Sequence, residues 1–198
     1  SLSPWNFGVF SNGLNFDGTN DYVQLADSEA LKPTNVTVSL WIKPDRTYSN
    51  QSTTLLSKEF PGIGGGFSLR YMQWDRGVMS FLLCVNQWPR YYDVYCYTTL
   101  QAGVSYHLVG TYDGTYQRLY INGQKVAEAP RSIEIYYPER APRIGASADD
   151  SPGYFFDGLI DDPRIYNSGL PYDQVLGLYE VGADLDNDGL SNMAEFRL

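Results

Sequence analysis

The chain has 198 residues, 43% of them hydrophobic, and carries a formal net charge of −9. A negative field of this size argues against nucleic acid and anionic membrane surfaces as partners, because both are bound by clustered Lys or Arg. No segment approaches the roughly 18 consecutive apolar residues of a membrane span, so we expect no membrane insertion.

Short runs in which apolar and polar residues alternate dominate the chain. Residues 36–43 are the clearest run, and others lie at residues 21–25, 53–57, 66–72, 78–85, 105–112, 117–121 and 125–128. This period of two is typical of half-buried strands. Asn122-Gly123 predicts a tight type I′ turn between the last two runs. About nine to twelve short strands separated by turns predict an all-β, antiparallel two-sheet sandwich.

One segment near the end has a helical pattern instead. Residues 171–180 place Val175, Leu176 and Tyr179 on one face, and Gly182 is expected to end the helix. We therefore expect residues 1–181 to form the sandwich and residues 182–198 to form a separate calcium loop that links it to a further module.

The two cysteines lie in neighbouring strand-like runs. If residues 81–85 and 93–98 pair as a hairpin centred near residue 90, Cys84 and Cys96 face each other and can form a cross-strand disulfide. Two buried thiols are the alternative. A disulfide would suit an extracellular protein.

An aromatic segment at residues 88–97 is the strongest indication of a ligand site. Sugar rings have apolar C–H faces that stack on Trp and Tyr, while their hydroxyls pair with Asp and Arg. Loops lie on the surface, so this cluster is not expected to be all core. The alternative is a loop that folds back on one end of the sandwich. The candidate carbohydrate-binding residues are Trp88, Arg90, Tyr91, Tyr92 and Asp93, together with Trp74 and Arg76.

Catalytic patterns find little support in the sequence. His107, the single histidine, lies within an alternating strand and is expected to be a core residue. Glycosidases pair two carboxylates on one inward-facing strand, whereas the nearest pairs here, Glu134 with Glu139 and Asp157 with Asp161, fall in a turn or within the motif at residues 156–166. We therefore expect no enzymatic activity.

The end of the chain matches a calcium-binding loop of the EF-hand type. Gly189 supplies the sharp turn, and oxygen ligands fall at the loop positions that such a site requires. The alternative is an acidic, solvated tail. The candidate calcium ligands are Asp184, Asp186, Asp188, Leu190 through its carbonyl, Asn192 and Glu195.

Several segments together carry a family resemblance over about residues 13–180. They are LNFDGTNDYV (14–23), VTVSLWIKP (36–44), HLVGTYDG (107–114), LYING (119–123) and FDGLIDDPRIY (156–166). Their order resembles the laminin-G-like, concanavalin A-like jelly-roll family in its bacterial secreted form. The tail is similar to thrombospondin type 3 or dockerin-like calcium loops. Pro163, where the family usually has Val, and the aromatic insertion around residues 84–97 depart from the pattern.

The resemblance implies a second calcium site between the first and last strands. Its ligands would be Asp17, Asn20 through its carbonyl, and Asp161 or Asp162, of which we favour Asp162. The alternative is that Asp17 and Asp21 make hydrogen bonds within their own turn.

These observations favour a non-catalytic, calcium-stabilised carbohydrate-binding module. We expect it to be secreted or on a cell surface, monomeric, and covalently linked to neighbouring modules of a larger enzyme or adhesin. Its partner would be a polysaccharide or oligosaccharide. The alternative is a structural or adhesive module that binds a protein partner.

Overall fold

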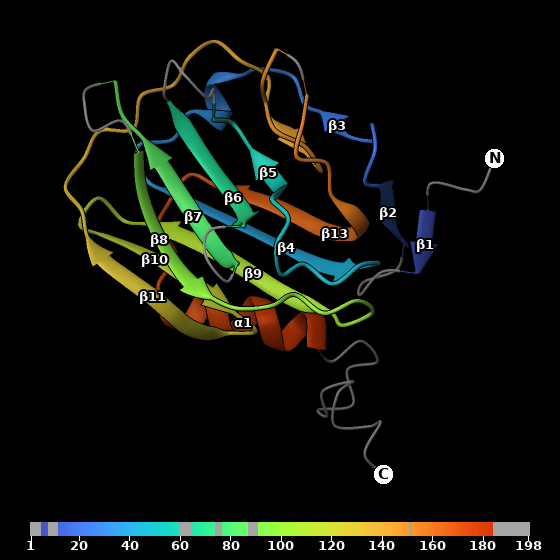
Figure 1. The fold of residues 1–198 in the computed structure, drawn as a ribbon. Helices are drawn as coiled ribbons and strands as arrows, with labels where there is room; N and C mark the ends of the chain where they lie inside the picture. The colour runs from blue at the N-terminus through green and yellow to red at the C-terminus, as the bar shows by residue number, and fades with distance from the viewer. Residues whose placement is uncertain are drawn as a thin grey trace.

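The computed structural model describes residues 5–7, 12–59, 65–73, 77–86, 91–150 and 152–183. Within these residues two antiparallel β-sheets pack face to face, and a single α-helix covers the outside of the larger sheet (Figure 1). The predicted all-β sandwich is therefore confirmed.

The larger sheet has seven strands in the order β1-β2-β13-β4-β9-β10-β11. Their bounds are β1 (Trp5–Phe7), β2 (Asn12–Asp17), β13 (Asp157–Tyr166), β4 (Val36–Pro44), β9 (Tyr106–Tyr112), β10 (Tyr116–Ile121) and β11 (Gln124–Pro130). The smaller sheet has six strands in the order β3-β12-β5-β6-β7-β8. Their bounds are β3 (Val23–Gln24), β12 (Arg143–Ile144), β5 (Thr53–Ser57), β6 (Gly66–Met72), β7 (Val78–Cys84) and β8 (Tyr91–Tyr97). A short 3-10 helix, η1 (Glu29–Leu31), and α1 (Tyr172–Ala183) are the described helices.

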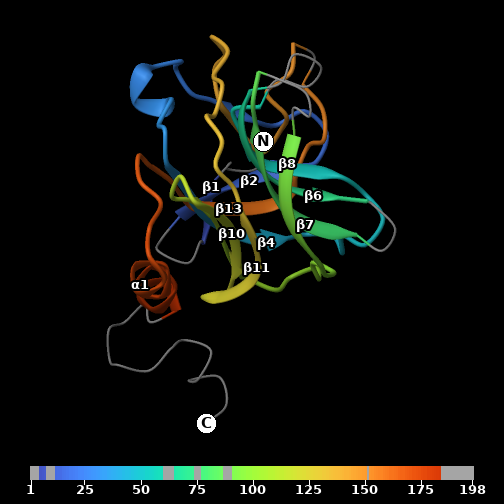
Figure 2. The same ribbon diagram turned by 90° about the vertical axis from the view of Figure 1, so that its left-hand side faces the viewer.

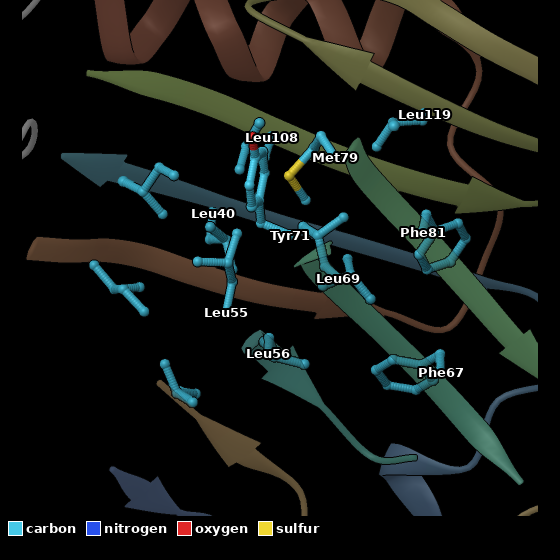
Figure 3. Close-up of a cluster of buried hydrophobic side chains, with 14 of the residues drawn as sticks. Leu40, Leu55, Leu56, Phe67, Leu69, Tyr71, Met79, Phe81, Leu108 and Leu119 are labelled. Atoms are coloured by element: carbon cyan, nitrogen blue, oxygen red, sulfur yellow. The ribbon is translucent and has the colours of Figure 1, made fainter. Parts of the chain in front are cut away.

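The core fills the space between the two sheets. Alternate residues of each strand point inward, as the pleat of a strand requires. Figure 3 shows Leu40 and Leu108 of the larger sheet facing Leu69, Tyr71 and Phe81 of the smaller one, and all are buried. Each such side chain contributes about 1.5–3 kcal/mol through its removal from water. The alternating pattern of the sequence therefore has its origin in this shared core.

Helix α1 lies on the outer side of the larger sheet, away from the smaller one (Figure 2). Val175 packs against Val109 and Tyr120, and the ring of Tyr179 stacks on Trp41 at 5.8 Å. This contact explains why the outward side of β4 is also buried. No helix in the described part of the chain is long and apolar enough to cross a membrane.

Gly182 has a different role from the one expected. The predicted helix is confirmed, but it continues through Gly182 to Ala183. A Cβ atom at Gly182 would lie 2.6 Å from the indole nitrogen of Trp41, so the residue allows α1 to approach the sheet closely. The expectation that Gly182 ends the helix is therefore wrong.

The predicted turn between β10 and β11 is confirmed. Asn122 has φ 50° and Gly123 has φ 72°, the two positive values that a type I′ turn requires. A bulge between Asp161 and Arg164 interrupts the pairing of β13 with β4, and it contains Pro163. Proline, which lacks a backbone N–H, is tolerated in a strand at such a bulge.

Candidate functional site

Three exposed tyrosines follow one another along the outer face of β8. Val94 of this strand points into the core, so the residues that alternate with it point away from the core. Tyr91, Tyr95 and Tyr97 are 39%, 45% and 57% exposed, and the rings of Tyr95 and Tyr97 meet edge to face at 5.9 Å. These three residues are called the tyrosine strip. Strand β8 is the edge of the six-stranded sheet, so the strip lies along one border of that sheet's outer face.

A part-buried group of charges lies next to the strip. The Arg70 guanidinium, on β6, lies 3.4 Å from one oxygen of Glu59 and 3.3 Å from both oxygens of Asp93. Asp93 belongs to β8 and also accepts a hydrogen bond from the Ser80 hydroxyl of β7. Glu59, Arg70 and Asp93 are called the charged cluster. The contacts within the charged cluster hold its carboxylate and guanidinium groups in fixed directions beside the exposed tyrosine rings.

The charged cluster has an excess of carboxylates. Burial raises the pKa of the Glu59 carboxyl to about 7; Arg70 opposes this shift, while Asp149 and Asp93 add to it. Glu59 is therefore only partly ionised near neutral pH. The neighbouring Cys84 thiol also has a raised pKa, mainly because it is buried, so it is not activated as a nucleophile.

A hollow lined in part by aromatic side chains lies at one end of the sandwich. It has a volume of about 650 Å³ and is lined in part by Asn86, Tyr92, Tyr136 and Tyr137. The backbone carbonyl of Tyr92 accepts a hydrogen bond from the Gln117 side chain at 2.8 Å, and Arg131 lies over its ring at 5.1 Å. Tyr92 is thus held among groups of the opposite sheet.

The predicted carbohydrate-binding residues meet different outcomes. Trp74, Arg76, Trp88 and Arg90 lie outside the described residues. Tyr91 and Asp93 come together on the outer face of the six-stranded sheet.

Tyr92 does not join them, because consecutive residues of a strand point to opposite faces. Sequence reasoning missed Glu59, Arg70 and the full extent of the strip. The alternation around Val94 was the signal that would have added Tyr95 and Tyr97.

The strand register does not bring together the ligands favoured for a calcium site between the first and last strands. Asp17 pairs with Asp157 in the sheet, and Asp162 lies five residues further along β13, about 16 Å away at the usual rise of a strand. Asp17 accepts hydrogen bonds from the amides of Thr19 at 2.8 Å and Asn20 at 3.2 Å, as the alternative reading expected.

The other favoured ligand, Asp162, also makes a contact within the protein. Asp162 accepts a hydrogen bond from Arg164 at 2.7 Å. Among the described residues, no group of three or more His, Cys, Asp or Glu side chains is placed to hold a metal ion. The loop from Asp184 to Glu195 lies outside the described residues, so that prediction stays open.

The predicted disulfide is also wrong. In the β7–β8 hairpin Cys84 lies opposite Tyr91, and Cys96 lies opposite Met79. The centre of the hairpin is displaced from residue 90, and both cysteines are free thiols. Strand pairing therefore keeps them several residues apart.

His107 is held beneath α1. Its Nε2 lies 2.9 Å from the Ser39 hydroxyl, and its ring stacks on Trp41 at 5.0 Å. Burial lowers the pKa of His107 to about 4, so the ring is neutral at physiological pH. This environment agrees with the predicted core role.

A family model described as the concanavalin A-like lectin/glucanases superfamily, of the laminin G type, matches residues 17–176. The chain belongs to this superfamily. The matched region includes every described strand of the sandwich except β1 and all of β2 but its last residue, Asp17. The family resemblance carried by the five motifs is thereby confirmed.

Solved structures with the same fold include proteins recorded with a bound saccharide. Domain 4 of a GH43 extracellular arabinanase from Geobacillus stearothermophilus, in complex with arabinotriose, is 24% identical with a TM-score of 0.67. The alignment covers 88% of this chain and 80% of that one. The CBM40 domain of the IT-sialidase from Ruminococcus gnavus is 17% identical with a TM-score of 0.65, covering 84% and 96%.

A pentraxin from Limulus polyphemus is also similar. It is 16% identical with a TM-score of 0.62, and the alignment covers 89% of this chain and 86% of that one. A comparison with curated proteins finds no match. At these identities the similarity to the solved structures establishes the fold alone. The ligand of this concanavalin A-like chain has to be inferred from its own surface.

Proposed function

We propose that this protein is a non-catalytic carbohydrate-binding domain whose binding surface is the tyrosine strip together with the charged cluster. The observation that carries the proposal is the row of three exposed tyrosines on one edge strand, beside charged groups already held in place. An extended saccharide can lay the C–H faces of successive sugar rings along such a row. The alternative, a protein partner on the same surface, is an outcome of the test below.

The polar side of the ligand would be bound by the charged cluster. Hydroxyl groups both donate and accept hydrogen bonds, so one sugar can contact a carboxylate of Asp93 and a guanidinium N–H of Arg70. Arg70 and Asp93 are each 14% exposed in their side chains, which leaves them accessible at the surface while their geometry is fixed from below. A fixed surface loses little conformational entropy on binding.

The fold relatives support this proposal. One is recorded with arabinotriose, and the CBM40 domain is also recorded with α2,3-sialyllactose. The first of these belongs to an extracellular enzyme. By analogy we propose that this domain acts outside the cell and holds an attached enzyme or adhesin on a polysaccharide. The affinity of one domain is expected to be weak, with gains from multivalency.

A glycan array followed by calorimetry on the best ligand tests the proposal. Tyr97→Ala and Tyr95→Ala should each raise Kd roughly tenfold, the loss of about 1.4 kcal/mol of stacking. Tyr172→Ala is the matched control, because that ring is 53% exposed but lies in α1 on the other sheet. The proposal fails if both strip variants bind as tightly as the unmodified protein. Binding of a protein partner that these variants abolish would favour the adhesive alternative.

A further inference from the structure

Arg70 is shared between two carboxylates of the protein. Glu59, which follows β5, lies 3.4 Å from its guanidinium, and Asp93 of β8, the strand beyond β7, presents both of its oxygens at 3.3 Å. An arginine that binds an acidic sugar commonly directs two parallel N–H groups at the ligand's carboxylate. Here the guanidinium N–H groups of Arg70 already point at carboxylates of the protein itself.

The surroundings add further negative charge. Asp149 lies close enough to Glu59 to oppose its ionisation. Arg143 of β12 is another guanidinium in this region, and it donates to the carbonyls of Ser147 at 2.9 Å and Asp149 at 2.6 Å. Among these described groups, Glu59, Asp93 and Asp149 lie near two guanidinium groups that already contact protein oxygens.

We infer that this face selects uncharged saccharides and rejects those that carry a carboxylate or sulfate group. The inference rests on the proposed function and concerns the class of ligand at the same surface. An acidic ligand would bring a negative charge beside Glu59 and Asp93 and would have to displace one of them from Arg70. The displaced carboxylate would then be part-buried without its charge partner, which is unfavourable. A neutral hydroxyl avoids both costs.

The discrimination should depend on pH through Glu59. The described groups that face it are Arg70 of β6, Asp93 of β8, Cys84 of β7 and Asp149 of the segment before β13. As pH rises from 5 to 8 Glu59 gains its charge, so residual binding of an acidic ligand should weaken. Binding of a neutral ligand should change little over this range.

Two matched pairs of probes test the inference. The first pair is lactose and α2,3-sialyllactose; the second is a methyl-esterified oligogalacturonate and the free-acid oligogalacturonate of equal length. At constant ionic strength the neutral member of each bound pair should have a Kd at least about tenfold lower. Equal or tighter binding of the acidic member would overturn the inference alone. If no probe binds, the proposed function and the inference both fail.

A double variant identifies the cause of the selectivity. Glu59→Gln with Asp93→Asn removes both charges from Arg70, so the preference for the neutral probe should shrink or reverse. The control is Asp113→Asn with Glu128→Gln, because these residues share Arg118 in the same way but on the other sheet. An equal change in the control would assign the effect to total charge and overturn the role of Arg70. If the first double variant does not fold, Glu59→Gln alone with the pH series takes its place.

Discussion

Gly110 on β9 lies directly against the ring of Phe81 on β7, across the interior of the sandwich. A Cβ atom added at Gly110 would come within 2.3 Å of the Phe81 Cγ, closer than real Cβ atoms approach any neighbour. The aromatic ring of one sheet therefore fills the space that a side chain on the other sheet would need. This contact sets the local spacing of the two layers.

Gly110→Ala should destabilise the fold. The added methyl must move Phe81 or separate the sheets, and overpacking of this kind costs about 1–3 kcal/mol. Chemical denaturation measures the change. Gly177→Ala is the matched control, because Gly177 lies in α1 with no atom near its added Cβ. That control should gain about 0.5–1 kcal/mol. A Gly110→Ala variant as stable as the unmodified protein would show that the layers adjust freely.

Stability should fall on mild acidification because of His107. Its pKa in the folded state is about 4, below the ordinary histidine value of 6.5, so the unfolded chain binds the extra proton between these values. The free energy of unfolding should drop as pH falls through this window, by at most about 3 kcal/mol. Melting temperatures between pH 4 and 7 for the unmodified protein and His107→Gln measure this. Parallel curves would contradict the prediction.

Glu59 should act in the opposite direction. Its pKa is raised from 4.5 to about 7 in the folded state, so the folded protein holds a proton that the unfolded chain releases. This contribution is fully present below pH 4.5 and is lost as pH rises toward 7. Glu59→Gln should therefore gain stability relative to the unmodified protein as pH rises. The difference between their melting temperatures at pH 5 and pH 8 is the quantity to compare; a constant difference would refute the assignment.

Calcium binding by the Asp184–Glu195 loop remains a prediction with a direct test. Titration calorimetry with CaCl₂ should show binding that is lost in Glu195→Gln, because the residue at position 12 of such a loop supplies two oxygens to the ion. Asp173→Asn, in the first turn of α1, is a control of equal charge change. Unchanged calcium binding in Glu195→Gln would exclude the loop as the site.

Local pattern was enough to predict the sandwich, the helix and the hairpin turn. Alternation in β4 and the Asn122-Gly123 pair act over a few residues, and the structure keeps both. The register of the strands could not be predicted from the alternating pattern. A period of two is unchanged by a slip of two residues, so it did not reveal that Phe81 faces Val94 and that Cys84 therefore misses Cys96.

Only part of the candidate site could be predicted from the sequence, for a related reason. Tyr91 and Asp93 belong to one conspicuous aromatic segment. Glu59 follows β5 and Arg70 belongs to β6; neither carries a local signature, and only the sheet order brings them to Asp93. Long-range pairing, rather than composition, creates the charged cluster.

The place of β13 in the larger sheet has a consequence for synthesis of the protein. This strand is inserted between β2 and β4, although about 140 residues separate Asp17 from its partner Asp157. Until residue 166 has left the ribosome, β4 offers an open edge that can pair with another chain. Contacts of such long range are also slow to form. The nascent chain thus depends on β13 to close the seven-stranded sheet, and products truncated before β13 should aggregate where the domain that contains it does not.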